Sequence, residues 1–559
     1  MQSDSFRPFL PAEAEIVARL LSGDLDRLGD GLRPEVEDPK RVIRAALLRF
    51  LLLGGEEGYR LHEKGLRLSG AYIKGVLDLE ACRVPRDIGL KDCRFDATPV
   101  LSSAVIDRLF LDGSYLPGLA AERLETRGGL YLRGAHVGGG IRLADARLGG
   151  NLSCDGATIH VTDGIALDAR RLEVRNVYLR GADIRGGVNL SGARLEADLD
   201  CAGAVVSRPD KVAVAADAID AGGSVILRAA RVDGEVRLPG SRIGGDLDCS
   251  GAAFVNPGHN ALQLSRTLIE GAFFLRNGAE VKGLLDMQGA SIDTVHDDLA
   301  CWPGKGDVRL NRCRYGAFID GPVDARGRLD WLSLQTPERW GEDFWPQPFE
   351  QLATVFREMG HDEDARAVLI AKERLQRRAR RKRARSRLWR GMIAVKDGIL
   401  EVTVAYGRQP LLAFVWLTLF WLFGVIIFGY AERQDAFKPN SPVVLRSPEW
   451  TLCGVGKSEQ RFLASTQQSV NGRAETGQTQ LACFREQWEA SSYPRFNAWM
   501  YSLDTLLPVL EIDQKAYWRP DPSKRWGTSA LTYFYFQSVV GWALSLLAVA
   551  GFSGLVKSQ

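Results

Sequence analysis

The feature that most constrains this chain is a repeat that extends from Leu66 to about Gly327. Four related hexapeptides recur with a period of about 48 residues, a spacing typical of repeat architectures. They are Leu130-Tyr-Leu-Arg-Gly-Ala, Val177-Tyr-Leu-Arg-Gly-Ala, Val225-Ile-Leu-Arg-Ala-Ala and Phe273-Phe-Leu-Arg-Asn-Gly. Inside each interval a step of 11 residues leads, for example, from Leu132 to Leu143 to Cys154, and two such steps are expected to make one turn. Self-similarity on this scale predicts an elongated stack of turns.

Each step of 11 residues divides again into five and six. The apolar positions of this finer pattern are Leu132, Val137, Leu143, Leu148, Cys154 and Ile159. A small residue, such as Ala135 or Ala146, often stands two residues earlier. We expect one inward apolar side chain for each face of a coil and a small residue at each tight corner. Glycines such as Gly138 and Gly139 would supply corner backbone angles that a Cβ obstructs.

The alternation of a small residue and an apolar residue is typical of one known fold. It is carried here by Ala135-His-Val137, Ala146-Arg-Leu148, Ala182-Asp-Ile184 and Ala193-Arg-Leu195. This pattern resembles the pentapeptide-repeat proteins, and the resemblance implies a right-handed quadrilateral β-solenoid over residues 61–330. The mixed spacing of five and six departs from the strict pentapeptide repeat. A flexible region rich in Gly and Ala is the alternative.

Residues 1–60 are predicted to form a helical cap on the solenoid. Two helices are expected between residues 11 and 53, the second with Asp38 as its N-cap, Pro39 at the first helical position and a stop at Gly54-Gly55. An open solenoid end would leave strand edges unpaired, so a plug is needed there. A separate ligand-binding domain is the alternative. Residues 1–30 contain no apolar run typical of a signal peptide, which predicts a cytoplasmic N-terminus.

A local basic cluster dominates the charge pattern. The 559-residue chain has a formal charge of only +3, yet residues 372–390 contain eleven Lys and Arg against one Glu. The chain is also long enough for three or four modules. Nucleic acid is one conceivable partner, but the cluster precedes an apolar segment, where basic residues attract anionic lipid. The residues expected to face lipid are Arg377, Arg378, Arg380, Arg381, Lys382, Arg383, Arg385 and Arg387.

Residues 331–395 are predicted to be a helical hairpin followed by this basic linker. The hairpin has one helix from Phe349, a turn at Gly360 and a second helix with Asp362 as its N-cap. It resembles a single tetratricopeptide-style hairpin. One such hairpin cannot form a peptide-binding array, because these repeats need several neighbours, so we expect it to cap and couple.

Residues 396–559 are predicted to form a membrane domain. Residues 411–430 and 528–556 carry no charge and are long enough to cross a bilayer. Two spans place both termini in the cytoplasm of a bacterial-type inner membrane and the loop 431–527 outside. Buried helices of a soluble protein are the alternative. Cys453 and Cys483, the two cysteines of that loop, are predicted to form a disulfide in the oxidising compartment.

The segment from Tyr493 to Asp513 lies just before the second span. It is predicted to form a short helix over residues 495–507, to stop at Pro508 and to return as an extended strand. The order of span, short helix, strand and span resembles the two-span pore module of potassium-type channels over about residues 410–556. Thr505-Leu-Leu-Pro-Val-Leu-Glu stands where that family has its Thr-x-Gly-Tyr-Gly filter. An amphipathic helix on the outer membrane surface is the alternative.

The resemblance to a pore module implies a set of candidate pore residues. They are Asp504, Thr505, Pro508, Glu511 and Asp513. Rings of carboxylates at a pore mouth favour cations. We expect Glu511 to have the largest influence on selectivity and Asp504 to hold the turn by hydrogen bonds.

Paired carboxylates in the solenoid are the other chemical candidate. Asp198 with Asp200, and Asp246 with Asp248, sit two residues apart and so on one side of an extended strand. Such pairs could hold a cation or act as acid and base. The equivalent positions elsewhere carry Asn151 and Ser153, so we favour an outward polar ladder.

No catalytic motif is present, and we predict no catalytic residue, metal ligand or cofactor. The leading hypothesis is an oligomeric, cation-preferring channel or pore, a tetramer by analogy, gated through a cytoplasmic β-solenoid. Its partners would be membrane lipids and a protein or ligand on the solenoid, with no nucleic acid. The alternative is a membrane-anchored scaffold, and a membrane-associated oxidoreductase is a third class without motif support.

Overall fold

The computed structural model describes residues 3–20, 23–56, 58–383, 386–407, 409, 411–454, 474–475 and 477–552. The chain divides into two compact units, Met1–Lys372 and Glu373–Gln559, and each is described by itself.

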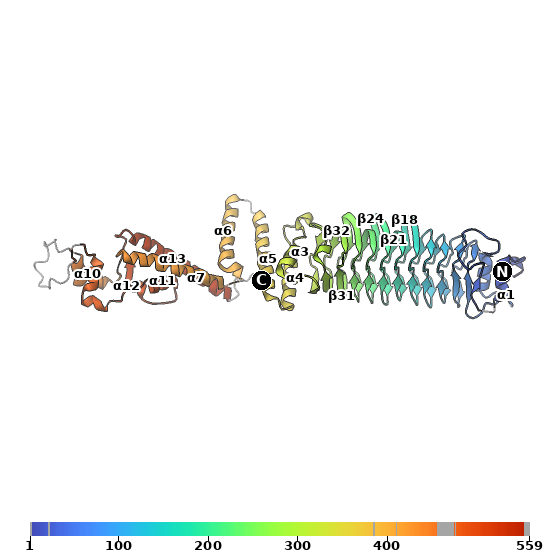
Figure 1. Ribbon diagram of the computed structural model, residues 1–559, viewed down its shortest axis with the longest axis horizontal. Helices are drawn as coiled ribbons and strands as arrows, with labels where there is room; N and C mark the ends of the chain where they lie inside the picture. The colour runs from blue at the N-terminus through green and yellow to red at the C-terminus, as the bar shows by residue number, and fades with distance from the viewer. Residues whose placement is uncertain are drawn as a thin grey trace, which may run out of the picture. The chain divides into compact units, whose positions relative to one another are not determined.

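The first unit is a parallel β-solenoid of about 12 turns over residues 66–319 (Figure 1). One turn contains four short strands: β12 (Glu125–Thr126), β13 (Leu130–Tyr131), β14 (His136–Val137) and β15 (Ile141–Arg142). β12 and β13 belong to one sheet, whereas β14 and β15 belong to the other. The predicted solenoid is therefore confirmed, and the division into five and six residues corresponds to four strand positions per turn.

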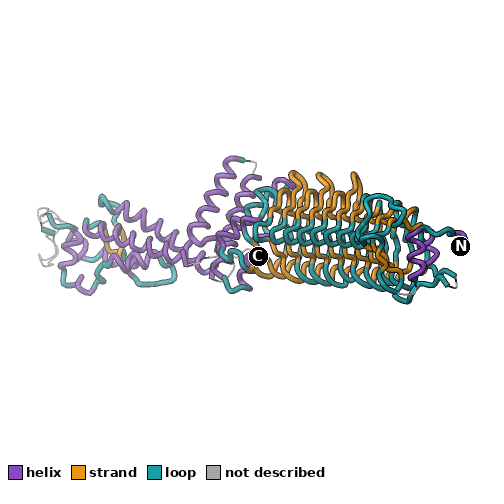
Figure 2. Tube along the Cα trace, turned by 45° about the vertical axis from the view of Figure 1, so that its right-hand side comes forward, coloured by secondary structure: helices purple, strands orange, loops and turns teal. Residues whose placement is uncertain are grey.

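The turns before Leu130 are all short, and from Leu130 onward a shorter turn alternates with a longer one. Leu130 pairs with Leu152 in the next turn, and Leu152 pairs with Val177 in the turn after that, so the second of these turns is the longer one. Three 11-residue strands accommodate the extra residues of the longer turns, and they are β18 (Thr158–Asp168), β24 (Val205–Ala215) and β30 (Ala253–Gln263). They lie at one edge of the solenoid in Figure 2. The prediction that every turn equals two equal steps was wrong for the three longer turns, and the long interval between the related hexapeptides is a pair of turns.

The axis of the solenoid is filled by one side chain per face of each turn. Leu132, Cys154 and Leu179 occupy the same position in successive turns and are fully buried. Burial of these side chains removes apolar surface from water, which stabilises the folded state by about 25 cal/mol per Å² of surface buried.

The corners differ from the prediction. Neither Gly138 nor Gly139 adopts a left-handed backbone, and a Cβ at Gly139 would lie 2.4 Å from the carbonyl oxygen of Pro117. These glycines allow close approach of the neighbouring turn. The left-handed corner is elsewhere and accepts Asp145 (φ 59°) and Arg171 (φ 53°).

Both helices and strands close the N-terminal end. α1 (Pro11–Arg19) and α2 (Ala45–Leu52) are the two predicted helices, and α2 ends just before the glycine pair. The predicted start at Asp38 was wrong, because β2 (Val42–Arg44) extends the solenoid before α2 begins. β2 pairs with β4 (Tyr72–Lys74) and so covers a strand edge of the first turn.

The C-terminal end is closed by α3 (Ala325–Leu332) and α4 (Gln347–Glu358), which follow the last strand, β35 (Arg314–Ile319). The side-chain amide of Gln347 donates to the carbonyl oxygen of Cys313 at 3.0 Å, and that of Gln351 donates to Tyr315 at 2.8 Å. Two glutamines one helical turn apart thus satisfy carbonyl groups that the last turn leaves unpaired.

A buried ion pair lies under the C-terminal cap. Arg328 of α3 donates two hydrogen bonds of 2.7 Å to the carboxylate of Asp297, and both side chains are fully buried. Trp302 Nε1 also donates to Asp297 at 2.6 Å, and the Arg328 guanidinium lies 3.6 Å from the centre of the Phe318 ring.

The second unit is helical. After the end of α5 (Asp362–Arg383), its larger helices are α6 (Arg387–Val404), α7 (Leu411–Arg433), α11 (Ala498–Leu506) and α13 (Gly527–Phe552). By length and composition, 23 residues of α7 and 24 residues of α13 are sufficient to cross a membrane. Beyond α7, β36 (Phe437–Pro439) pairs antiparallel with β37 (Trp518–Pro520).

Candidate functional site

The short helix α11 lies lengthwise between α7 and α13. A Cβ at Gly424 of α7 would lie 2.2 Å from Ser502 Oγ, and a Cβ at Gly541 of α13 would lie 1.8 Å from the carbonyl oxygen of Leu506. Ala498, one turn earlier, lies next to Gly429 of α7. α11 therefore runs antiparallel to α7 and parallel to α13. Glycine is required at Gly424 and Gly541 because α11 comes so close.

The C-terminal end of α11 is deep in the bundle. Gly541 stands more than half-way along α13, at about 21 Å from the first residue of that helix, Gly527. Leu506 also packs with Leu417 of α7 and Leu544 of α13. The short helix thus enters from the end where α7 stops and α13 starts, and it passes the middle of both helices.

Polar contacts hold α11 at that depth. The fully buried side-chain amide of Gln537 in α13 donates to Ser502 Oγ at 2.9 Å and to the carbonyl oxygen of Phe420 at 3.3 Å. Ser502 Oγ donates to the carbonyl oxygen of Trp421 at 2.8 Å. These bonds satisfy the Gln537 amide nitrogen and the Ser502 hydroxyl, which would otherwise cost free energy in an apolar environment, whereas the buried Gln537 Oε1 accepts no hydrogen bond from the described residues.

Asp504 folds the chain back after α11. Its fully buried carboxylate accepts the backbone N–H of Ile512 at 3.2 Å and that of Lys515 at 2.8 Å. The Lys515 Nζ lies 3.4 Å from the same carboxylate. Asp504 thus has the turn-fixing position that we expected from the sequence.

The return path differs from the predicted extended strand. Asp513 adopts a left-handed backbone (φ 64°), and residues 514–517 form the short helix α12 (Gln514–Tyr517). The strand of this return path is β37, which pairs with β36. Because the Asp504 carboxylate binds two N–H groups of the return segment, that segment has no need of a backbone ladder. α11 also begins three residues later than predicted, with Asn497 as its N-cap.

The predicted pore residues do not converge within one chain. Thr505 is buried and its hydroxyl donates to the carbonyl oxygen of Tyr501 in its own helix, while Pro508 is half-buried. Glu511 and Asp513 are exposed. At the tip, Val509 is 87% exposed.

The depth of Glu511 follows from its neighbour. Ile512 is bonded to Asp504, and Asp504 stands on α11 between the levels of Ser502 and Leu506. Glu511 is therefore held beside the middle of the two apolar helices, not beside their ends.

Gln537, Ser502 and Lys515 were missed from the sequence. Gln537 offered a signal, because it is an amide in the middle of an uncharged run. Ser502 and Lys515 offered none, since their roles depend on which segment they meet.

The predicted disulfide is present in the structure. Cys453 of α9 (Pro448–Cys453) and Cys483 of α10 (Gln480–Glu486) are bonded, with 5.6 Å between their Cα atoms. Both cysteines are buried beside Phe484. The bond closes a loop of 30 residues and joins two short helices that have little other core.

The basic cluster divides into two groups. Arg377 Nη1 lies 2.8 Å from Asp397 of α6, and Arg381 lies 3.8 Å from the same carboxylate. These two residues therefore hold α6 against the end of α5. The exposed members are Arg378, Arg380, Lys382, Arg383 and Arg387, whereas Arg385 lies outside the described residues.

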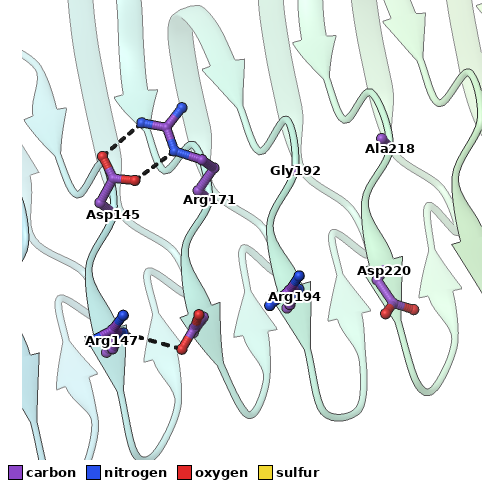
Figure 3. Close-up of a pocket in the computed structure, with 8 residues that line it drawn as sticks. Asp145, Arg147, Arg171, Gly192, Arg194, Ala218 and Asp220 are labelled. Carbon is purple, nitrogen blue, oxygen red and sulfur yellow. Dashed lines mark hydrogen bonds and ion pairs between the residues drawn. The ribbon is translucent and has the colours of Figure 1, made fainter.

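A charged groove on the solenoid was not predicted (Figure 3). Arg171 donates two hydrogen bonds to Asp145, at 2.6 and 2.7 Å, and these bonds hold the pKa of the Asp145 carboxyl below its ordinary value. The next two turns carry Gly192 and Ala218 at this corner. Because neither residue has a large side chain, a depression is left above Arg194.

The floor of this groove is a ladder of alternating charge. Successive turns place the following residues in register: Glu125, Arg147, Glu173, Arg194, Asp220 and Arg242. Arg147 lies 3.6 Å from Glu125 and 3.3 Å from Glu173. Opposite charges on neighbouring strands are favourable, and a slip by one turn would bring like charges together. This ladder is hard to recognise in the sequence, because turns of two lengths separate its members by unequal numbers of residues.

The paired aspartates have separate tasks. Asp198 accepts the backbone N–H of Ser224 at 2.8 Å, and Asp246 accepts that of Ala272 at 2.8 Å, so each holds the following turn. Asp248 binds Arg228 at 2.7 Å. This is the polar ladder that the sequence favoured.

Among the described residues, no group of three or more His, Cys, Asp or Glu is placed to hold a metal ion. No family model, curated protein or solved structure matches the chain. We therefore infer function from the geometry of the described residues.

Proposed function

We propose that this chain forms an oligomeric, cation-preferring pore in a bacterial-type inner membrane. α7 and α13 would span the bilayer, and the solenoid, of the right-handed quadrilateral kind, would gate the pore from the cytoplasm, where both termini lie. One observation carries the proposal: an irregular segment with a carboxylate, Leu507–Asp513, is exposed beside the middle of two apolar helices.

The argument is one of solvation. Within the hydrocarbon region, irregular backbone is tolerated only where protein buries it or where it lines a water-filled cavity. A charged side chain at that depth is similarly costly when it faces lipid. In one chain Val509 and Glu511 have neither form of protection. A ring of chains that turns this face inward supplies both.

An oligomer is also required by the number of helices. Two spans and one short helix cannot enclose a path, whereas closed rings of identical chains are common. Four copies is the number suggested by analogy with two-span channels. Each copy would then turn its exposed segment, Leu507–Asp513, toward one common axis.

Cation preference follows from the groups at that face. A ring of chains repeats Glu511 and Asp513, and carboxylate rings attract cations. The C-terminal end of α11 adds a partial negative charge of the same sign. Asp504 is already bound by Lys515 and two N–H groups, so we assign it to the turn.

The test is conduction by the purified full-length protein in planar bilayers. The double variant Glu511→Gln with Asp513→Asn should lower cation over anion permeability, read from reversal potentials in a salt gradient. The exposed Glu489, changed to Gln, is the matched control and should leave selectivity unchanged. Both variants should keep the particle mass of the wild-type protein in detergent.

Three results would contradict this proposal. A monomeric particle removes the enclosed path, and a wild-type protein that passes no current removes the pore. Unchanged selectivity in the double variant leaves a pore but removes the role of Glu511 and Asp513.

The second candidate is a membrane-anchored scaffold. It is favoured by the solenoid itself, whose ends are closed at β2 and α4 and whose charged ladder lies on its flank. A monomeric, non-conducting particle that binds a protein through this flank would support it. An oxidoreductase has no supporting cluster among the residues that the structure describes.

A further inference from the structure

Helix α6 has an apolar stripe that no described residue of the second unit covers. Its members, each between 54% and 85% exposed, are Leu388, Met392, Val395, Ile399 and Val402. Their spacing of four, three, four and three residues places them on one side of the helix. Five large apolar side chains in a continuous row are unusual on a surface that meets only water.

The side of α6 opposite the stripe is occupied. Asp397 and Glu401 face the basic end of α5, where Arg377 lies 2.8 Å from Asp397 and Arg374 lies 2.8 Å from Glu401. The stripe is therefore the face of α6 that points away from α5.

Contacts with the apolar helices fix the place of α6. Leu400 packs with Ala413 near the start of α7 and with Ala548 near the end of α13. Trp416 Nε1 of α7 donates to the carbonyl oxygen of Val402 at 3.0 Å. α6 runs steeply across the direction of α7 and α13 in both views (Figures 1 and 2). If α7 and α13 cross a bilayer, α6 lies at its surface.

The residues that flank the stripe suit a bilayer surface. At about 100° per residue, Arg387 and Lys396 stand on opposite flanks, each about 80–100° from the centre of the stripe. Both are exposed, as is Trp389 beside Lys396 in angle. Long basic side chains can reach phosphate groups while their stems cover apolar surface, and Trp favours the same interface.

We propose that α6 is an interfacial helix whose stripe is embedded in the membrane leaflet where α7 begins. Arg387, Lys396 and the exposed residues Arg378 and Arg380 contact anionic phospholipid headgroups. This inference depends on the proposed membrane insertion of α7 and α13, but it does not depend on conduction. Such helices sit with their apolar face about 5–10 Å below the headgroup boundary.

The bilayer is favoured over a protein partner for two reasons. The stripe is continuous with the membrane-spanning region through Leu400 and Trp416. Its flanks are basic, whereas its acids, Asp397 and Glu401, are already paired on the far side. The charge of the exposed flanks thus matches anionic lipid.

The test places single nitroxide labels on the full-length protein in vesicles of phosphatidylcholine, with and without phosphatidylglycerol. The substitutions are Val395→Cys and Ile399→Cys in the stripe. Ile426→Cys, on an exposed part of α7, is the control for lipid, and Glu363→Cys, on an exposed part of α5, is the control for water. Labelled wild-type protein supplies the background from native cysteines. Relaxation by oxygen reports lipid, and relaxation by a water-soluble nickel chelate reports solvent.

Val395 and Ile399 should resemble Ile426, with an oxygen-to-nickel ratio several-fold above that of Glu363. Adding phosphatidylglycerol should raise this ratio, and the quadruple change of Arg378, Arg380, Arg387 and Lys396 to Gln should abolish the increase.

The remaining outcomes separate the two proposals. If Ile426 favours oxygen while Val395 and Ile399 behave like Glu363, α6 is in water and the inference is wrong although the spans stand. If the stripe is shielded from both reagents, protein covers it and the inference is again wrong. If Ile426 itself favours nickel, membrane insertion fails and both proposals fall.

Discussion

The solenoid and the helical unit solve the same problem, the satisfaction of buried polar groups, in opposite ways. In the solenoid the solution is repeated: Asp198 holds the turn that follows it, and Asp246 does the same two turns later. In the helical unit each solution occurs once, as at Gln537 and Asp504. When a contact is repeated in every pair of turns, neighbouring turns keep their own copies if one copy is lost. A contact that occurs once cannot be replaced in this way. The ends of the solenoid, where the repeat stops, should behave like the helical unit.

The largest effect is expected at the C-terminal end of the solenoid. Changing Arg328 to Ala leaves the carboxylate of Asp297 buried and without its cationic partner, which should cost about 3–5 kcal/mol. Hydrogen exchange in the full-length protein should show the loss in the last turns and under α3. The control is Arg276→Ala, which removes the half-buried partner of the exposed Asp320 and should have a much smaller effect, because ion pairs open to solvent contribute little to stability. Equal effects of the two changes would mean that the end of the repeat is no more vulnerable than its flank.

A smaller effect is expected from the amide between the apolar helices. Gln537→Leu removes the hydrogen bond to Ser502 Oγ while keeping a similar volume. The Phe420 carbonyl keeps a 3.1 Å hydrogen bond from the Tyr533 hydroxyl, so the loss should be that of one buried hydrogen bond, about 1.5 kcal/mol. The loss should appear as faster exchange or proteolysis of α11 in detergent, with the solenoid unchanged. Gln434→Leu, at an exposed position just after α7, is the matched change outside the bundle. If it loosens α11 more than Gln537→Leu does, the central amide is not what holds the short helix.

The smallest effect concerns a repeated contact, that of Asp248. Burial raises the pKa of its carboxyl, but hydrogen bonds from Ser250 and Arg228 outweigh burial, and the pKa is lowered. Because the folded pKa is depressed, this stabilisation is complete above the unfolded pKa of about 3.9. It is lost as the pH falls through the folded value.

Asp248→Asn should therefore reduce stability by about 1 kcal/mol near neutral pH. It should also flatten the acid side of the stability curve. Unfolding midpoints of both proteins, compared from neutral to acid pH, provide the measurement. Parallel curves would show that Asp248 contributes no proton linkage.

Much of this architecture was predictable from the sequence because it is periodic. The apolar positions at Leu132, Leu143 and Cys154 predict a stack of turns without knowledge of any partner, and long uncharged runs predict apolar helices. The presence of two cysteines in the segment between the two uncharged runs predicted the disulfide between Cys453 and Cys483. In contrast, the predicted start of α2 was wrong, because residues 42–44 form a strand that pairs with a distant strand, β4.

Of the candidate site, the sequence determined which residues are polar in an apolar context, and the tertiary structure decided what each one does. Asp504, Glu511 and Asp513 are three carboxylates close together in the chain, yet one is buried against Lys515 and two are exposed. Local periodicity determines which side of an element is buried, because every turn repeats the same geometry. The partner of a single side chain depends on which distant segments meet, and that is decided by packing of the whole unit.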